Sequence, residues 1–155
     1  MKVEYINPFI EASQSVIKML TNCEIRIGKP YLKQTPYYFN QIVIVIGVVG
    51  EIRGQLYFEM PIETAKSIAS VMMGGMPVLE LDEISKSAIS EMGNMIMGNA
   101  STIFFNLNIN IDITPPTLLA GEIEMSNKIQ TVVVPVELEG IGNINININA
   151  EAIVD

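Results

Sequence analysis

Histidine is absent from this chain of 155 residues, and Cys23 is its only cysteine. These absences exclude metal sites built on histidine, Ser–His and Cys–His catalytic pairs, and any disulfide within the chain. Basic residues are also few, because nine Lys and Arg stand against seventeen Asp and Glu, a formal net charge of −8. No two basic residues are adjacent, so we expect neither nucleic acid nor an anionic membrane as a partner.

Long apolar runs are missing too. The longest, at 42–49, is far shorter than the roughly 20 residues that a membrane-spanning helix needs, and its β-branched residues favour a buried strand. Acidic residues lie where a signal peptide would be apolar, so we expect a cytoplasmic protein. With 49% hydrophobic residues and the length of one ordinary domain, residues 1–155 are predicted to fold as a single domain.

Periodicity and capping residues predict three helices, over about 8–21, 61–73 and 83–105. The first is expected to start at Asn7-Pro8, an N-cap followed by proline at the first helical position. The second stops at Gly74-Gly75, and the third follows Asp82, an N-cap residue.

Alternating apolar and polar residues predict strands over about 23–27, 41–49, 51–60, 107–113, 128–138 and 143–150, with a loop or short edge strand at 31–40. The Ile–Asn alternation from Asn143 to Asn149 is typical of an exposed edge strand. The order of elements predicts an α+β fold with helices packed on a mostly antiparallel sheet. It also fits a pseudo-repeat of two halves, each a helix followed by antiparallel strands.

The third predicted helix has two distinct faces when its residues are plotted at about 100° each. The side expected to pack on the sheet carries Ile84, Ala88, Met92, Met95, Ile96 and Ile103. Asn99 falls within that apolar arc, and we expect it to be buried and bonded to backbone. The opposite side carries Glu83, Ser87, Ser90, Asn94, Gly98 and Ser101, with Glu91 at its edge.

Glu91 and Asn94 are three residues apart, so they project as neighbours from one helix face. Gly98 lies one turn further on, where a missing side chain lets a partner approach closely. Together with the small Ser87 and Ser90, this makes a surface suited to docking. A Glu and an Asn on a solvated helix face are nevertheless common, and the spacing alone has almost no specificity.

A wider pattern adds that specificity. This chain carries Ser87-x-x-x-Glu91-x-x-Asn94 and, just over twenty residues later, Pro115-Pro116. The pattern resembles the signature of the CheC/CheX/FliY chemotaxis phosphatases. Three segments resemble CheX in particular, VMMGGM at 71–76, the stretch 81–99 and DITPPT at 112–117, and the resemblance spans about residues 7–150.

The first half of the chain also resembles CheX more than CheC. CheC carries the ExxN motif twice, whereas here Glu11 and Gln14 stand at the positions that correspond to Glu91 and Asn94. The first pair therefore departs from the motif, and one working site per chain is expected.

The resemblance implies a phosphatase that hydrolyses the aspartyl phosphate of a CheY-like response-regulator receiver, and it implies a homodimer. In that reaction Asn94 orients the attacking water, Glu91 pairs with the receiver's active-site lysine, and Ser87, Ser90 and Gly98 contact the partner. A carboxamide can accept from and donate to water without a charge that repels the phosphoryl group. Mg²⁺ comes with the phosphorylated receiver, so we expect no cofactor or metal site in this chain.

Two alternatives stay open. A binding or adaptor module of the same fold would dock a receiver or another chemotaxis protein without hydrolysis, as rotor-switch proteins use this fold for assembly. A structural oligomerisation domain would bury the polar face of the third helix in an interface. The presence of both Glu91 and Asn94 favours the enzyme.

Overall fold

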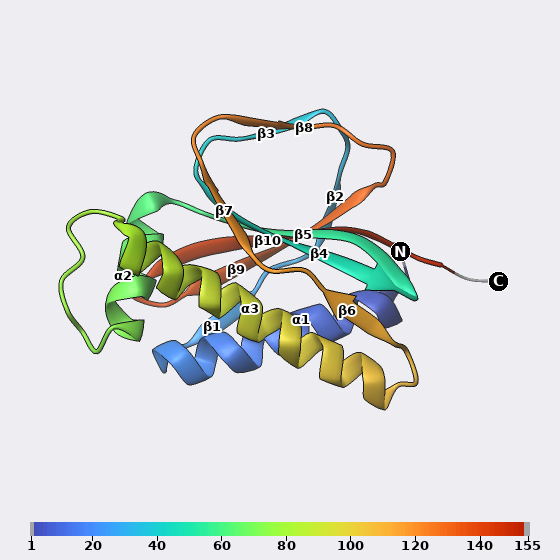
Figure 1. The fold of residues 1–155 in the computed structure, drawn as a ribbon, viewed down its shortest axis with the longest axis horizontal. Helices are drawn as coiled ribbons and strands as arrows, with labels where there is room; N and C mark the ends of the chain where they lie inside the picture. Colours follow the sequence, from blue (N-terminus) through green and yellow to red (C-terminus); the bar gives the residue numbers. More distant parts are fainter. Residues whose placement is uncertain (1, 154–155) are drawn as a thin grey trace.

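The computed structural model describes residues 2–153, which contain three α-helices and ten β-strands. The helices are α1 (Val3–Thr21), α2 (Ile62–Met72) and α3 (Glu83–Asn106). The strands are β1 (Ile25–Ile27), β2 (Tyr31–Lys33), β3 (Tyr37–Phe39), β4 (Ile42–Gly50), β5 (Ile52–Met60), β6 (Ile111–Ile113), β7 (Thr117–Ala120), β8 (Ile123–Met125), β9 (Thr131–Leu138) and β10 (Gly142–Ala152). Figure 1 shows the helices gathered beneath the large sheet, with β3 and β8 above it.

The predicted α+β architecture is confirmed, because the helices pack on a sheet whose strand pairs within residues 2–153 are all antiparallel. The large sheet has the order β1-β9-β10-β5-β4-β6, with β2 also beside β9 and β7 also beside β4. Strands β3 and β8 form a separate two-stranded sheet.

The strand pairing confirms two related halves. Strands β1 and β2 of the first half pair with β9 of the second, and β6 and β7 of the second pair with β4 of the first. The halves also meet through β5 with β10 and β3 with β8. Each half therefore completes the sheet of the other in a pseudo-twofold arrangement, and the two share one helix-side core.

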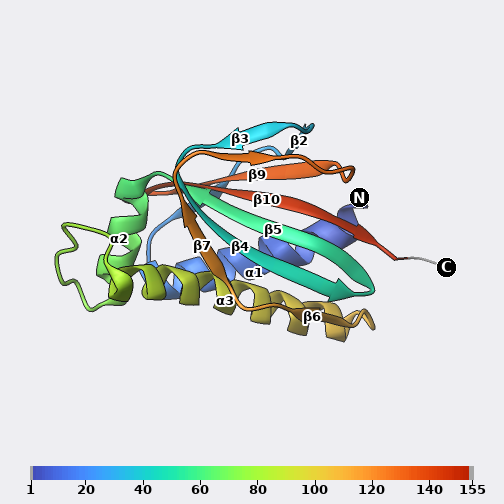
Figure 2. The ribbon, with the colours of Figure 1, turned by 45° about the horizontal axis from the view of Figure 1, so that its top comes forward.

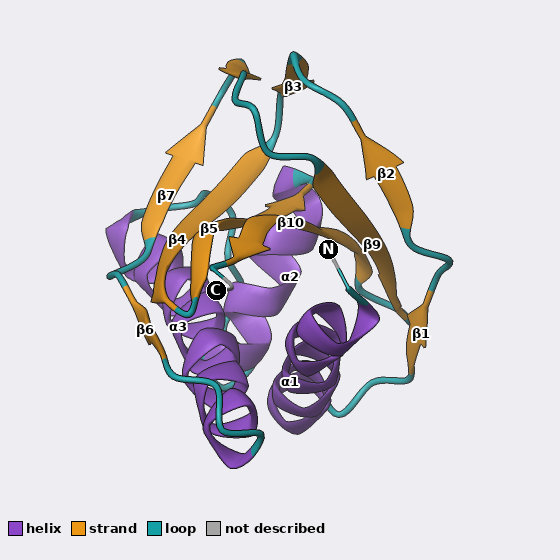
Figure 3. Cartoon of the chain, turned by 90° about the vertical axis from the view of Figure 1, so that its right-hand side faces the viewer, coloured by secondary structure: helices purple, strands orange, loops and turns teal. Residues whose placement is uncertain are grey.

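Two layers of side chains hold the fold together. On the helix side, Phe9 of α1 and Phe104 of α3 meet edge to face with ring centroids 5.0 Å apart. On the opposite side, β3 and β8 arch over the large sheet (Figures 1 and 3). A smaller cluster of buried side chains around Tyr37, Phe39 and Tyr57 lies on this side. Burial raises the pKa of the Tyr57 hydroxyl to about 12. None of the helices in the described part of the chain is long and apolar enough to cross a membrane.

The prediction of an exposed edge for residues 143–149 is wrong. Strand β10 lies inside the sheet between β9 and β5, and Asn147 and Asn149 are buried. The Asn149 amide donates to the Ile129 carbonyl and to Thr131 Oγ1, both at 2.8 Å. The asparagine side of this strand is therefore covered at Asn147 and Asn149, whereas Asn143 stays exposed.

Two helix predictions also need correction. Helix α1 begins at Val3 rather than near Pro8, and Pro8 lies inside it as a buried residue. Packing of Ile6, Pro8 and Phe9 on the core offsets the backbone hydrogen bond that proline cannot make.

The buried stripe of α3 is rotated from the predicted one, since Ile84 and Asn99 are exposed and Ser85 is buried. Gly93 lies within the observed buried stripe and packs closely on β4, where a Cβ would lie 3.2 Å from side-chain atoms of both Ile44 and Ile46.

Candidate functional site

The N-terminus of α3 is fixed by its predicted cap, Asp82. The Asp82 carboxylate accepts from the Ser85 backbone N–H at 2.9 Å and from the Ser85 hydroxyl at 2.8 Å. These hydrogen bonds, the backbone one first, hold the pKa of the Asp82 carboxyl below its usual value. The cap and the buried Met92 and Ile96 hold α3 in one position, so the side chains on its other face are presented on a rigid support.

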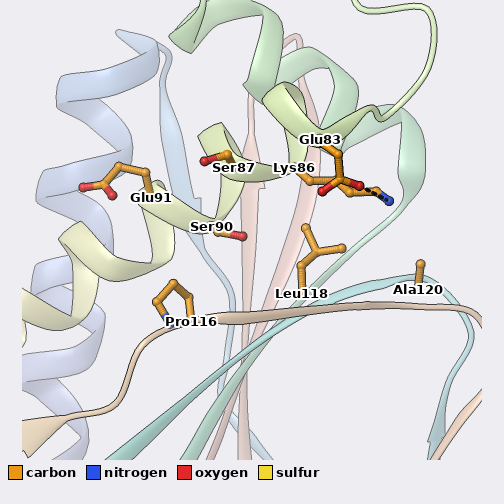
Figure 4. A pocket seen from close by; sticks show the side chains of 8 residues that line it. All are labelled: Glu83, Lys86, Ser87, Ser90, Glu91, Pro116, Leu118 and Ala120. Atoms are coloured by element: carbon orange, nitrogen blue, oxygen red, sulfur yellow. Dashed lines mark ion pairs between the residues drawn. The ribbon is translucent and has the colours of Figure 1, made fainter.

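A hollow of about 580 Å³ lies between α3 and β7. Figure 4 shows Pro116, Leu118 and Ala120 on one side of it and the α3 side chains on the other. The α3 residues that line it are Glu83, Lys86, Ser87, Ser90 and Glu91. Both charge signs are present, and the Lys86 ammonium lies 3.7 Å from the Glu83 carboxylate.

The diproline segment is held in place by a contact with β4. The Thr114 N–H donates to the Gly47 carbonyl at 3.0 Å, and the Gly47 N–H donates to Thr114 Oγ1 at 2.8 Å. This pair of hydrogen bonds fixes the connection between β6 and β7, so that Pro116 lies across the hollow from α3. Pro116 of the signature and the α3 residues of the signature therefore line the same hollow.

The structure brings together three of the predicted site residues. Ser87 and Glu91 are exposed, Ser90 is half-buried, and all three line the hollow. Asn94 is half-buried and Gly98 is exposed; both lie outside the hollow, further along α3. The five residues lie on a face of α3 that the core leaves uncovered, and the i, i+3 spacing makes Glu91 and Asn94 neighbours there.

Sequence reasoning missed Lys86, Leu118 and Ala120 as parts of this site. Lys86 lies four residues before Ser90, and the helical period alone was enough to place it beside the predicted face. Leu118 and Ala120 carried no such signal, because β7 is a strand of only four residues. Within residues 2–153, no group of three or more His, Cys, Asp or Glu side chains is placed to hold a metal ion.

A smaller hollow of about 310 Å³ lies beside α1 in the first half. Its lining includes Glu11, Gln14 and Lys18 of α1 and Glu24 next to β1. Lys18 lies 3.8 Å from the Glu24 carboxylate and also donates to the Cys23 carbonyl at 3.3 Å. A long cationic side chain that already has partners in the chain therefore lines this hollow.

The helices correspond under the shift that relates Glu11 to Glu91, 91 − 11 = 80. Five buried positions of α1 then fall on buried positions of α3, namely Phe9, Ala12, Ser13, Val16 and Ile17 on Ile89, Met92, Gly93, Ile96 and Met97. In the same register Lys18 stands where α3 has Gly98, since 98 − 80 = 18. The two helices thus share a packing pattern and differ on their exposed faces.

Comparison with known proteins accounts for this combination of fold and surface. Residues 42–137 match the family described as chemotaxis phosphatase CheX. This chain belongs to the CheX family. The CheX match includes α3, the hollow and the diproline segment, whereas α1 with Glu11 and Gln14 lies outside it.

Individual CheX relatives cover most of the chain. The curated CheY-P phosphatase CheX of Thermotoga maritima is 36% identical over 121 residues, 78% of this chain and 78% of the relative. The crystal structure of a CheX–CheY–BeF₃–Mg²⁺ complex from Borrelia burgdorferi contains a chain 31% identical, with a TM-score of 0.81 and coverage of 97% and 99%. A CheC-like superfamily protein from Shewanella sp. PV-4 has a TM-score of 0.85 at 25% identity, covering 98% and 100%.

Proposed function

We propose that this chain is a phosphatase that hydrolyses the aspartyl phosphate of a CheY-like receiver domain. Membership of the CheX family and the name of the Thermotoga relative support the reaction class. The observation that carries the proposal is the Glu91–Asn94 pair, which stands on the uncovered face of a capped and firmly packed helix. In this proposal residues 1–155 act as one cytoplasmic domain, and they form a homodimer, as the family resemblance implies.

The proposed reaction depends more on positioning a water molecule than on a covalent bond between this chain and the phosphoryl group. Hydrolysis of an acyl phosphate requires a water molecule in line with the leaving carboxylate, and holding that water in place lowers the barrier. The Asn94 carboxamide has an oxygen that accepts from water and an NH₂ group that donates. The Glu91 carboxylate, one turn away, pairs with the receiver's active-site lysine and sets the distance of Asn94 from the phosphoryl group.

Mg²⁺ enters the proposal with the receiver. The Borrelia complex contains Mg²⁺ together with CheY and beryllium fluoride, a mimic of a phosphoryl group. On this proposal the chain contributes Glu91 and Asn94, and the receiver contributes the metal and the phosphorylated aspartate.

The decisive experiment mixes the purified chain with candidate phosphorylated receivers and follows the loss of acyl phosphate over time. Accelerated loss with one receiver supports the phosphatase and identifies its substrate. Tight binding of a phosphorylated receiver without accelerated loss would instead favour the adaptor module of the same fold.

Replacement of Glu91 by alanine is expected to weaken receiver binding and to lower the rate at subsaturating receiver. The substitution removes one partner of a charge pair across the interface, and such losses commonly cost about 2–5 kcal/mol. The receiver dissociation constant should therefore rise by roughly thirtyfold or more. Calorimetric titration with a beryllium fluoride-activated receiver measures it.

Glu11→Ala is the matched control for that variant, because Glu11 is the exposed counterpart of Glu91 on α1. It should bind the receiver as the wild type does. Equal weakening by Glu11→Ala and Glu91→Ala would argue against a specific ion pair at Glu91 and for a general effect of the chain's negative charge.

Replacement of Gln14 by alanine should leave dephosphorylation unchanged, and each chain should bind one receiver. Gln14 is one methylene longer than an asparagine, which displaces its amide by about 1 Å or more. Lys18 also occupies the position that Gly98 leaves open on α3. Calorimetry with an activated receiver gives the stoichiometry directly. A ratio of two receivers per chain would show that the first half is also functional.

A further inference from the structure

One buried oxygen in the middle of the large sheet lacks a hydrogen-bond donor. Asn147 of β10 is 0% exposed, and its Oδ1 atom has no hydrogen-bond partner within residues 2–153. Its Nδ2 atom donates to the backbone carbonyls of Tyr57 and Asn145, both at 3.2 Å. Reversing the amide would turn its oxygen toward these two acceptors, so the orientation is fixed and Oδ1 is the atom left without a donor.

Asn147 lies on the face of the sheet that is turned away from the helices. Figure 2 shows β10 between β9 and β5, and Figure 3 shows β3 on the opposite side of the sheet from the helices. Ile146 and Ile148 belong to the helix-side core, and Asn147 alternates with them along the strand. Bulk solvent does not reach it there, so its oxygen needs a donor from the protein or from an ordered water.

Two buried hydroxyl groups on the same side of the sheet have one proton more than their hydrogen bonds use. Tyr37 of β3 and Thr131 of β9 are 4% and 0% exposed, and their hydroxyl oxygens lie 3.0 Å apart. Thr131 Oγ1 also accepts from the Asn149 amide at 2.8 Å. Each hydroxyl has one proton, and the bond between them uses one of the two. The other, here called the spare proton, has no acceptor among the hydrogen bonds that these groups make within residues 2–153.

The spare proton and Asn147 Oδ1 lie within reach of one water molecule. Asn149, which bonds to Thr131, is two residues from Asn147 on the same face of β10, about 7 Å along the strand. A water that bonds to two groups spans roughly 5 Å between them, and the side chains are long enough to cover the difference. Water is the ligand that fits, because it accepts from a hydroxyl and donates to a carbonyl oxygen, whereas a metal cation accepts no hydrogen bond and a simple anion donates none.

We propose that a buried water molecule binds between β3 and the large sheet, where it accepts the spare proton of the Tyr37–Thr131 pair and donates to Asn147 Oδ1. The water completes a polar network that joins β3 of the first half to β9 and β10 of the second. Through the Asn147 amide the same network reaches Tyr57 of β5. A buried polar network stabilises one arrangement of its segments when every member is bonded. The water is therefore a structural component that holds the two halves in register.

A crystal structure of the chain at high resolution tests the site directly. A water is expected within about 2.6–3.2 Å of Asn147 Oδ1 and within the same distance of the Tyr37 or Thr131 hydroxyl. The Lys33 ammonium lies 4.5 Å from the centroid of the Tyr37 ring, so it is the alternative donor. A direct hydrogen bond from Lys33 to Asn147 Oδ1 would overturn the proposal. Side chains closed over Oδ1 with no water beside it would overturn it as well.

Oxygen-17 magnetic relaxation dispersion tests the water in solution, because it counts the water molecules that a protein holds for long times. Asn147→Leu removes the acceptor and should lower the count by one. Asn143→Leu is the matched control, since Asn143 is an exposed residue on the same face of β10, and it should leave the count unchanged. An equal count in the wild type and in folded Asn147→Leu would overturn the proposal, and so would the same loss in both variants.

The two hydroxyls allow a second test that does not change Asn147. Tyr37→Phe or Thr131→Val alone leaves one hydroxyl, whose proton is then free to bond to the water, so each single variant should keep the wild-type count. The double variant has no hydroxyl donor left and should lose one water. Circular dichroism verifies that each variant is folded. A double variant that keeps the full count would overturn the assignment of the donor and with it the proposed site.

Discussion

Replacement of Asn94 by alanine is expected to slow dephosphorylation of the saturated receiver by about 10²–10³-fold, the usual effect of losing one catalytic positioning or electrostatic group. Receiver binding should remain measurable, because Glu91 is intact. The α3 core is untouched, since Met92, Gly93 and Ile96 face away from this surface. Single-turnover measurement of acyl phosphate loss at saturating enzyme gives the rate, and circular dichroism verifies the fold.

Asn99→Ala provides a control on the same helix. Asn99 is an exposed amide five residues further along, and its loss should change neither the rate nor the binding. If Asn94→Ala works at the wild-type rate, another group orients the water. If Asn94→Ala loses binding as completely as rate, Asn94 contributes to docking and its assignment to water is wrong.

Replacement of Gly98 by lysine is expected to weaken receiver binding roughly tenfold to hundredfold while the free energy of unfolding stays equal or rises. A Cβ at Gly98 meets no atom of the chain within 4 Å, so the side chain is accommodated in the free protein. Lysine also favours a helix over glycine by up to about 1 kcal/mol. In the complex the side chain occupies space that the receiver needs, and overpacking of this kind costs about 1–3 kcal/mol.

Gly98→Ala tests the same effect with a smaller side chain. One methyl group should raise the free energy of unfolding, and it should weaken receiver binding less than lysine does. Chemical denaturation gives the first quantity and calorimetry the second. Unchanged receiver affinity in Gly98→Lys would place the edge of the interface before this turn of α3. The variant also reproduces the exposed face of α1, where Lys18 stands at the corresponding position.

Features that depend on neighbours in the chain were predictable. The β4–β5 hairpin has long apolar strands around Gly50, and α3 starts after Asp82 because a short acidic side chain caps its first N–H groups. The exposure of Ser87, Glu91 and Gly98 followed from the helical period. Their grouping with Asn94 and a later diproline identified the family, which the comparisons confirm. The roles of Glu91 and Asn94 stay predictions.

Features that depend on distant contacts needed the tertiary structure. Alternating Ile and Asn in β10 looks the same whether the asparagines face water or a covering segment, and only the position of β10 between β9 and β5 shows that Asn147 and Asn149 are buried. Which face α3 buries likewise shows only in its packing, where Gly93 lies close against Ile44 and Ile46 of β4.

The apposition of Pro116 and Glu91 likewise depends on a hydrogen-bonded contact between Thr114 and Gly47, 67 residues apart in sequence. The sequence by itself thus determined which chemical groups this protein presents on α3 and in what spacing, because helical period and capping are local. Only the tertiary structure decided what faces those groups, because that is set by strand pairing and packing between segments far apart in the chain.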